Sequence, residues 1–423
     1  MPFLALLIAS PLALLCLWAG FRSDRRRRIL EDTPTIPIRG AYIGFVELAG
    51  RAQCAAPRHC HLATGPCVFH RWSVTERWSR TETESYTDNK GNRRTRTVHK
   101  SGWRTMDEGG GAEDFMLLDN SGQIAVRMRG ATIEAASVFD QTVGPNDPLY
   151  YGKGPREATR DSDHRRQFTE EAITLNAKLF ICGQVQLTGD GNAIEVARDD
   201  QAPMYLISVR NESAVRRSQR WHAVLLHLLG LVLTVGGSVI VALQVADLLR
   251  TPVPLMMPLG AGLIYLGLWL LGAWLVVFNS LVNLRRRVDQ AWANVDVQLR
   301  RRHDLIGQLL PVVTAWRDHE AGTQTVVASL RSQLTATPPG QPGPDPARTS
   351  QDLRALAEAY PTLTADDAFT RLSAALSDCE DRIAMARGFF NEMATFFNTR
   401  LQHVPEGWIG AVAGIRTRAL LSW

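Results

Sequence analysis

The residues best suited to chemistry are soft metal ligands that gather near residue 60. They are Cys54, His59, Cys60, His61, Cys67 and His70. Four such side chains can hold a structural zinc ion, but structural sites usually take them from closely spaced pairs such as C-x2-C. The cluster lacks two clean pairs. We therefore favour a loop with incidental ligands and one buried strand cysteine, Cys67. A zinc site on Cys54, His59, Cys60, His61 and Cys67 is the alternative, and we expect no cofactor.

A polar stripe in the C-terminal part is the second candidate. Glu380, Arg387, Asn391 and Asn398 are spaced by seven, four and seven residues, which places them on one face of a helix. Polar residues that could face this stripe lie on an earlier helical segment: Asn279, Asp296 and Arg302. A half-buried polar group that is left unpaired costs about 1–3 kcal/mol. We favour pairing across a helical bundle that fixes its register, with a ligand or catalytic site as the alternative.

Several common catalytic motifs are absent from the sequence. It has no HExxH, no Walker A sequence, no GxGxxG and no GxSxG. These absences argue against a zincin protease, a P-loop nucleotidase, a dinucleotide-binding enzyme and an α/β-hydrolase. Gly109–Gly111 is flanked by acidic residues, which is a poor setting for a phosphate.

Three apolar blocks determine where these candidates can lie. We expect a transmembrane anchor at 1–21, a transmembrane helix at 221–248 and a third at 255–284. About 20 residues of helix cross a bilayer, and each block is close to that length or longer. The third block continues into a polar segment whose apolar stripe is Val288, Trp292, Val295 and Leu299. One helix therefore leaves the membrane and enters a soluble helical domain.

Arginine clusters predict the orientation. They follow the first span, precede the second and follow the third: Arg22, Arg25–Arg28, Arg216, Arg217, Arg220 and Arg285–Arg287. We expect a bacterial inner membrane. The positive-inside rule then places the N-terminus outside and both 22–220 and 285–423 on the cytoplasmic side. The formal net charge of +5 comes mostly from these residues, which suit anionic lipids and call for no nucleic-acid partner. We expect the cysteines to be reduced.

Residues 33–210 have the pattern of a β-rich domain. Segments 115–126 and 178–197 are strand–turn–strand patterns with Gly, Asn, Ser or Asp at the reversal, and 204–209 is a further strand. A longer hairpin is predicted over 72–106 with its turn at Asp88–Gly91; its 73–104 arms have few apolar residues, so it could project from the domain. Residues 139–164 are expected to form an irregular loop.

Residues 285–410 have the pattern of an all-α antiparallel bundle. Apolar residues recur at steps of three and four along a seam: Phe369, Leu372, Leu376, Cys379, Ile383, Ala386, Phe390, Met393 and Phe397. The proline-rich segment 338–346 is a predicted loop, and 351–360 a further predicted helix that Pro361 ends. Three or four long helices are expected.

The β-rich part resembles a known module. The matching segments are Thr33–Gly40, Gly44–Gly50, Leu62–Phe69, Phe115-x-Leu-x-Asp-x-x-Gly122, Val126, Gly130-Ala131, Arg166-x-x-Thr-Glu170 and Gly183. They resemble the GIDE or "beside a membrane" domain, which lies between two transmembrane helices in mitochondrial-type E3 ubiquitin ligases and has bacterial relatives. Those ligases carry a RING finger after the second span. This chain has a single cysteine there, Cys379, so it cannot form a RING.

The C-terminal part carries a second resemblance over 276–410. It rests on Phe278–Val282, Arg287-Val-x-x-Ala-Trp-x-Asn-Val-Asp-Val-Gln-Leu299, Arg302-x-Asp-Leu-Ile306, His319-Glu320, Arg331, Glu358–Pro361, Glu380, Arg387, Phe390-Asn391, Phe396–Asn398 and Pro405. The set is similar to the LemA family. The resemblance implies a membrane-anchored helical protein, mainly bacterial, without an established enzymatic activity. Fold-level likeness does not supply a function.

These patterns favour a non-enzymatic role. We expect a three-span membrane protein that carries both modules and acts as a scaffold or adaptor that recruits protein partners, with a homo-oligomer as one assembly it could form. Its contact surfaces would be the 73–104 hairpin and exposed helix faces. The alternatives are an E3 ubiquitin ligase-like transferase or an unrecognised hydrolase, and a ligand-sensing membrane protein.

Overall fold

The computed structural model describes residues 4–87, 93–189, 193–210, 212–317 and 367–421, with isolated helical residues at 327–328, 330–332 and 358. The chain forms two compact units. One comprises Met1–Tyr42 with Arg216–Trp423, and the other Ile43–Val215. The expected turn at Asp88–Gly91, the proline-rich 338–346 segment, His319-Glu320 and nearly all of the expected 351–360 helix lie outside the described residues.

The 43–215 unit is built on a small closed barrel. Its strands are β2 (Gly44–Gln53), β6 (Phe115–Leu118), β7 (Gln123–Val126), β12 (Ile194–Ala197) and β11 (Lys178–Leu187), each paired with the next, and β11 pairs back to β2. Two short strands extend it, β13 (Leu206–Ser208) and β8 (Thr132–Glu134). Alternate apolar side chains fill the interior, including Leu48, Leu117 and Ile181. The predicted 115–126 and 178–197 pairs are confirmed.

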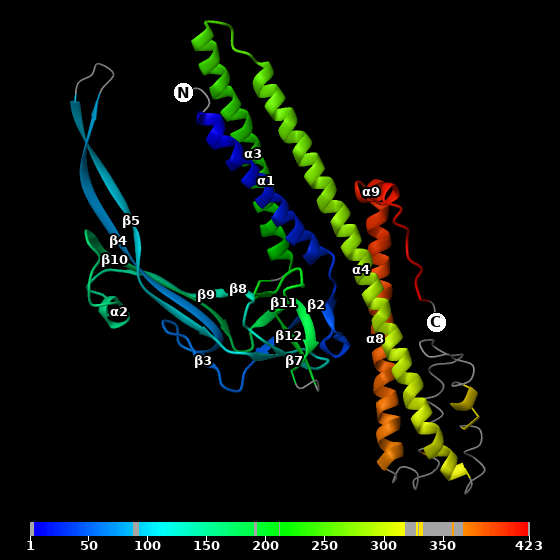
Figure 1. Ribbon diagram of the computed structural model, residues 1–423. Coiled ribbons are helices and arrows are strands. Elements are labelled where there is room, and N and C mark those ends of the chain that lie inside the picture. The colour runs from blue at the N-terminus through cyan, green and yellow to red at the C-terminus, as the bar shows by residue number, and fades with distance from the viewer. Residues whose placement is uncertain are drawn as a thin grey trace. The chain divides into compact units, whose positions relative to one another are not determined.

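A second sheet carries the long hairpin of β4 (Pro66–Thr87) and β5 (Arg93–Ala112), which extends away from the barrel in Figure 1. It also contains β3 (Arg58–His59), β9 (Ala136–Val143) and β10 (Ser162–Thr174). Beyond Trp78, β4 pairs with β5 alone, so the outer part is a two-stranded ribbon. Its surface carries ion pairs, including Lys100–Glu82 at 2.6 Å. The hairpin predicted over 72–106 is thus present and longer.

The expectation of an irregular loop over 139–164 is wrong. Phe139–Val143 belongs to β9, which pairs with β10, and α2 covers Pro148–Gly152. The side chains of β9 are mostly exposed, so the strand has no apolar alternation to reveal it. The helix follows a local signal, since Asp147 caps it by accepting a hydrogen bond from the amide of Leu149 at 2.8 Å and Pro148 occupies its first turn.

A buried ion pair joins α2 and the following loop to the long hairpin. Arg166 and Glu76 are both fully buried, 3.2 Å apart. Arg166 also donates to the carbonyls of Tyr150, Pro155 and Glu157. Burial alone raises the pKa of Glu76, but hydrogen bonds from Ser162, Tyr150 and the Thr159 amide, with Arg166, lower that pKa below its ordinary value.

Three helices are long and apolar enough to cross a membrane: α1 (Leu4–Glu31), α3 (Glu212–Leu249) and the first half of α4 (Met256–Arg317). In the helical unit, α1 and α3 run antiparallel, with Ala9 beside Gly237 and Ser23 bonded to Gln219. Helices α3 and α4 are also antiparallel. Phe21 lies so close to Gly272 that a Cβ there would clash, which shows how glycine permits the approach of α1 to α4.

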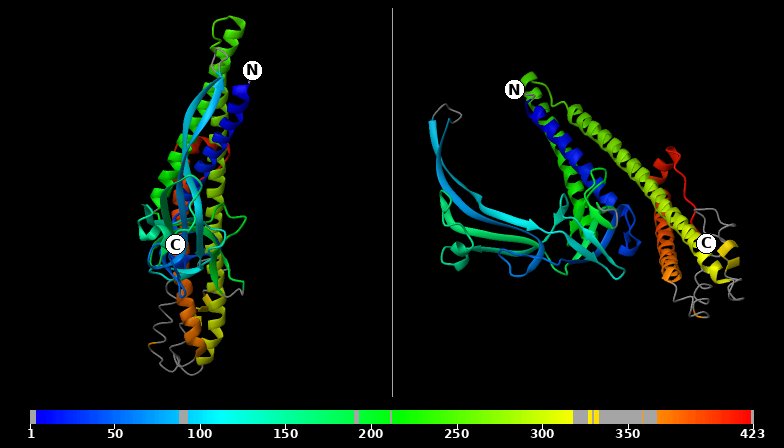
Figure 2. Two further views of the ribbon diagram at one scale, coloured as in Figure 1. Left: turned by 90° about the vertical axis from the view of Figure 1, so that its left-hand side faces the viewer. Right: turned by 60° about the horizontal axis from the view of Figure 1, so that its bottom comes forward.

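Helix α4 continues without a break into a packed pair with α8 (Asp367–Gln402), and the two lie side by side in Figures 1 and 2. The pair is antiparallel, because the buried Leu284 end of α4 meets the Phe397 end of α8. Of the predicted seam residues, all are buried except Leu372, which is partly buried. Of the predicted α4 stripe, Val288, Val295 and Leu299 are buried, whereas Trp292 is 41% exposed.

Short elements complete this unit. Helix α9 (Glu406–Val412) packs through Ile409 on Val277 and Leu281 of α4. After α1 come β1 (Thr35–Ile36) and a 3-10 turn, η1 (Ile38–Gly40). Within the described residues the C-terminal part is therefore a long helix pair with a short covering helix; the expected third and fourth long helices concern segments that are not described.

We predict that Arg166→Ala lowers the free energy of unfolding of the 43–215 unit by about 3–5 kcal/mol, because it leaves the Glu76 carboxylate buried without its cation. The measurement is pulse proteolysis of the solubilised chain in urea, scored by fragments of this unit. The matched control is Arg198→Ala, which removes an exposed ion pair with Asp200 and should change the value by less than about 0.5 kcal/mol. Equal effects of the two substitutions would contradict the prediction.

Candidate functional site at the junction of α1, α4 and α8

The last turn of α1 is fastened to the helix pair through Asp32, whose side chain is buried. Its carboxylate accepts a hydrogen bond from the Ser280 hydroxyl of α4 at 2.6 Å and from Arg400 of α8 at 3.0 Å. Arg287 donates to the backbone carbonyl of Asp32 at 3.0 Å and to the hydroxyl of Thr33. The end of the first apolar helix is thus bonded to both helices of the pair.

Arg400 is shared by three carboxylates. Besides Asp32, it lies 3.3 Å from Glu31 and 3.5 Å from Glu406 at the start of α9. Glu406 is also paired with Arg28 of α1 at 2.9 Å. We call Arg28, Glu31, Asp32, Arg287, Arg400 and Glu406 the charged junction. Three guanidinium groups and three carboxylates balance there, so each buried charge has an opposite neighbour.

The carboxylates of the junction respond differently to burial. Burial raises the pKa of Asp32, and the nearby Arg400, Arg287 and Arg28 with the Ser280 hydroxyl offset only part of that rise. Burial also acts to raise the pKa of Glu406, but the hydrogen bond from Arg28 and the charges around it bring this pKa below its ordinary value. Of these two carboxylates, burial therefore disfavours the ionised form of Asp32 more, and that form depends on the neighbouring arginines.

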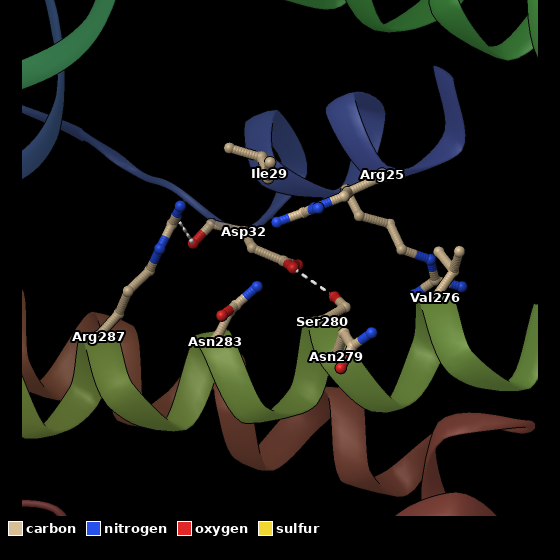
Figure 3. A pocket seen from close by; sticks show the side chains of 9 residues that line it. Arg25, Ile29, Asp32, Val276, Asn279, Ser280, Asn283 and Arg287 are labelled. Atoms are coloured by element: carbon tan, nitrogen blue, oxygen red, sulfur yellow. Dashed lines mark hydrogen bonds between the residues drawn. The ribbon is translucent and has the colours of Figure 1, made fainter. Parts of the chain in front are cut away.

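A pocket opens beside the junction, between α1 and α4. It is lined by Arg25, Arg28, Ile29, Asp32, Val276, Asn279, Ser280, Asn283 and Arg287. Its volume is about 50 Å³, which admits a group of a few heavy atoms. Ser280 and Asn283 point from α4 toward Asp32 (Figure 3). Guanidinium and amide donors predominate, so the pocket suits an anionic group such as a phosphate.

The segment after α1 continues along α8. Arg39 pairs with Asp378 at 2.7 Å, and the ring of Tyr42 lies 5.4 Å from that of Phe389. Burial raises the pKa of Tyr42 to about 12, although Arg287 acts against this rise. The α1 end is therefore held by contacts along much of α8.

The structure places the residues of the predicted polar stripe in several separate surroundings. Glu380 and Arg302 form a pair across α8 and α4, with the nearest charged atoms 3.7 Å apart and Arg302 buried. Asp296 pairs along α4 with Arg300 at 2.9 Å. Asn279 lines the pocket. Arg387 is half-buried on α8, and the stripe as a whole does not converge on one point.

Asn391 and Asn398 bind the C-terminal segment of the chain. Each side-chain amide donates to a backbone carbonyl and accepts from the amide of the same residue: Asn391 pairs with Leu421 at 2.9 and 2.8 Å, and Asn398 with Arg418 at 2.8 and 2.8 Å. The spacing of seven residues places both asparagines on the face of α8 where the segment lies.

Two of the Cys/His residues near position 60, His61 and His70, bind the carboxylate of Glu170. Glu170 is buried and accepts hydrogen bonds at 2.7 Å from the backbone amides of His61, Leu62 and Ala63, and lies 3.1 Å from Nδ1 of His70. His61 stacks on Trp72. Among the described residues, no three His, Cys, Asp or Glu side chains are placed to hold a metal ion. Burial raises the pKa of Cys67 to about 12, which favours a protonated thiol.

Part of the charged junction (Arg400 and Glu406), the two asparagines and most of the α4–α8 seam belong to a stretch with known relatives. Residues 291–423 match the LemA family. We refer to this stretch as the LemA region. It includes Glu380, Asn391, Asn398 and Arg400, and it also includes α9 and the C-terminal segment that the asparagines bind.

A second family matches an earlier part of the chain, and one characterised protein is similar to part of the chain. Residues 83–242 match the GIDE family, described as E3 ubiquitin ligase. Magnetosome protein MamQ of Magnetospirillum gryphiswaldense is 25% identical over 172 residues, which cover 34% of this chain and 63% of that protein. The chain thus spans less than two thirds of this relative. No solved structure matches the chain.

We predict that Arg400→Ala destabilises the helical unit far more than Asp32→Asn. The first leaves Asp32, Glu31 and Glu406 short of a cation and should cost about 3–5 kcal/mol. The second keeps Arg400 paired with two carboxylates and should cost about 1 kcal/mol. The urea concentration at which the solubilised chain loses protease resistance reports the stability of each variant. Equal losses of stability would show that Asp32 is the one carboxylate that depends on Arg400.

Proposed function

We propose that this chain is a membrane-anchored scaffold of a bacterial inner membrane, in which the LemA region is held at the bilayer surface to recruit protein partners. The observation that carries the proposal is the charged junction. Helix α4 connects the third apolar segment to the LemA region without a break, and Arg400 bonds α8 to the end of the first apolar helix. A double attachment of this kind fixes a binding surface in place, which is what a scaffold requires.

The arrangement of the apolar helices supports one orientation. Antiparallel packing of α1 and α3, and of α3 and α4, gathers Arg25–Arg28, Arg216, Arg217 and Arg285–Arg287 at the same end of the helical unit. The positive-inside rule makes that end cytoplasmic and places the N-terminus outside. Both soluble parts are then cytoplasmic, and the anion-binding pocket lies at the depth of lipid phosphates.

The long hairpin of β4 and β5 suits partner recruitment. Tyr86 lies on its outer ribbon and Trp103 on β5 at the base of that ribbon; each is nearly half-exposed and is paired across the hairpin with an arginine, Arg94 and Arg77 respectively. Aromatic side chains with a polar rim are typical of protein contact surfaces. On α8, in contrast, Glu380 pairs with Arg302, and Asn391 and Asn398 bond to the chain's own backbone, which favours a structural role over catalysis.

The match to the GIDE family favours one rival, a ubiquitin ligase-like transferase. Its chemistry would need a zinc-bound RING, and Cys379 is the sole cysteine after residue 220. Stoichiometric zinc in the purified chain, together with transfer of a ubiquitin-like protein, would establish this rival in place of the scaffold.

We predict that partner proteins co-purify with the wild-type chain from its native membranes but not with the Arg400→Ala variant. The variant should be inserted normally but recover about tenfold less of each partner, because its LemA region is no longer held in one position. The control, Arg382→Ala, removes a partly exposed α8 ion pair with Asp378 and should recover partners like the wild type. Catalytic turnover by the purified chain that disappears in Glu380→Gln would contradict a scaffold role.

The orientation is testable with single cysteines and a maleimide that does not cross membranes. A cysteine at Thr251, in the exposed link between α3 and α4, should be labelled on intact spheroplasts. Cysteines at Asp200 and Glu392, both exposed, should be labelled only after the membrane is opened. Wild-type chain treated with the same maleimide gives the background from the native cysteines. The opposite pattern would reverse the orientation.

A further inference from the structure

The C-terminal segment 415–421 lies along one face of α8, which we call the groove, and is held there through its backbone. Asn391 and Asn398 each make a two-point contact with the backbone amide and carbonyl of one residue, Leu421 and Arg418 respectively. A side-chain amide that pairs in this way makes the two backbone hydrogen bonds that a neighbouring β-strand would make. It makes no contact that depends on the side chain of the bound residue. The contact therefore recognises an extended peptide of almost any sequence.

The spacing of the two asparagines fits an extended chain. Seven residues of helix advance about 10.5 Å, and three residues of extended chain advance about 10 Å. Arg418 and Leu421 are three residues apart and face asparagines seven residues apart. The order is reversed along the two segments, so the peptide runs antiparallel to α8. The distance between the two asparagines along the helix thus matches the distance between Arg418 and Leu421 along an extended chain, as expected of a site that binds extended backbone.

Few other contacts hold the segment. Ile415 and Leu421 pack against the α4–α8 core, and Arg418 pairs with Asp289 of α4 at 2.6 Å with both side chains exposed by about half. The side chains of Arg416, Thr417, Ala419 and Leu420 are exposed. Surface ion pairs contribute about 0–1 kcal/mol. The two asparagines and two apolar contacts thus provide most of the attachment.

The segment is joined to α9 through one residue suited to change direction. Gly414 has φ +66°, a conformation that glycine adopts without strain. Its amide and that of Ile415 bond to Ala411 and Gly410 and close the end of α9. Among the described residues, no backbone–backbone hydrogen bond holds the chain beyond Ile415. Rotation at Gly414 can therefore release 416–421 without unfolding α9.

We propose that this groove is a peptide-binding site whose occupant can be exchanged, and that the C-terminal segment of a second copy takes the place of the chain's own. A second copy carries the same residues, so it makes the same contacts at equal free energy per contact, and only the connection through Gly414 differs. Confinement of copies to one membrane raises their effective concentration and favours the exchange. Each copy offers one groove and one segment, so the contact can link copies in series or pair them reciprocally.

This inference rests on the proposed function in one respect, the shared membrane. Its test uses two full-length copies with different tags, expressed in the same cells. One carries Asp289→Cys and the other Arg418→Cys, because these two side chains meet in the structure. A short bis-maleimide then joins the tags only when the segment of one copy lies in the groove of the other. We expect a product of twice the chain mass that neither copy gives without its partner.

A matched pair of variants assigns the product to the asparagines. Asn391→Ala with Asn398→Ala in the copy that carries Asp289→Cys should lower the cross-link about tenfold, because that copy supplies the groove. The same two substitutions in the copy that carries Arg418→Cys should not lower it, because that copy supplies only the segment. A synthetic peptide of residues 414–423 should also lower the yield. Cross-linking only when both cysteines are in one copy would overturn the proposal, and would leave the Arg400→Ala capture result unaffected.

Discussion

The arrangement of the helical unit depends on one guanidinium group, that of Arg400. It meets Asp32, Glu31 and Glu406 at once, so it connects the end of the first apolar helix, α8 and the start of α9. Buried charges are tolerated when each has a partner of opposite charge. Removal of a shared partner leaves every carboxylate that it bound short of a cation. A hydrophobic contact could join the same helices, but it would not fix their direction as a forked, planar group does. Arg400 therefore adds a second attachment between the LemA region and the apolar helices of its own unit, beside the continuous helix α4.

The 43–215 unit uses the same solution for loops. Arg166 holds three backbone carbonyls of the segment after α2, and Glu170 holds three backbone amides of the loop after β3. In each case one buried charged side chain hydrogen-bonds several consecutive or nearby backbone groups that make no β-sheet hydrogen bonds. Loops with few apolar residues gain order in this way, since backbone groups without partners are costly to bury. The Arg166 and Glu170 that the GIDE resemblance rests on are thus explained by structure.

Periodicity in the sequence was enough to predict the long continuous α4, the apolar seam of α8 and the β-rich region, because each depends on neighbours in the chain. It could not reveal that Asp32 and Arg400 meet, since they lie 368 residues apart and neither belongs to a repeating pattern. It missed β9, whose exposed side chains leave no alternation, and it missed the binding of segment 415–421, which is recognised through its backbone. The Cys67 position was visible as a buried strand residue, whereas the Glu170 centre of that cluster was not.

The polar stripe on α8 shows why equal spacing does not mean equal roles. Glu380 faces α4 where a cation, Arg302, is available, and it forms a pair within the helix seam. Asn391 and Asn398 are further along, where α8 is covered by the C-terminal segment instead of a helix. A carboxylate there could accept from a backbone amide but could not donate to the carbonyl beside it, whereas an amide does both. The change from charge to amide along one face therefore follows the change from a side-chain partner to a backbone partner, and it identifies the Asn391–Asn398 part of α8 as the part adapted to bind a peptide.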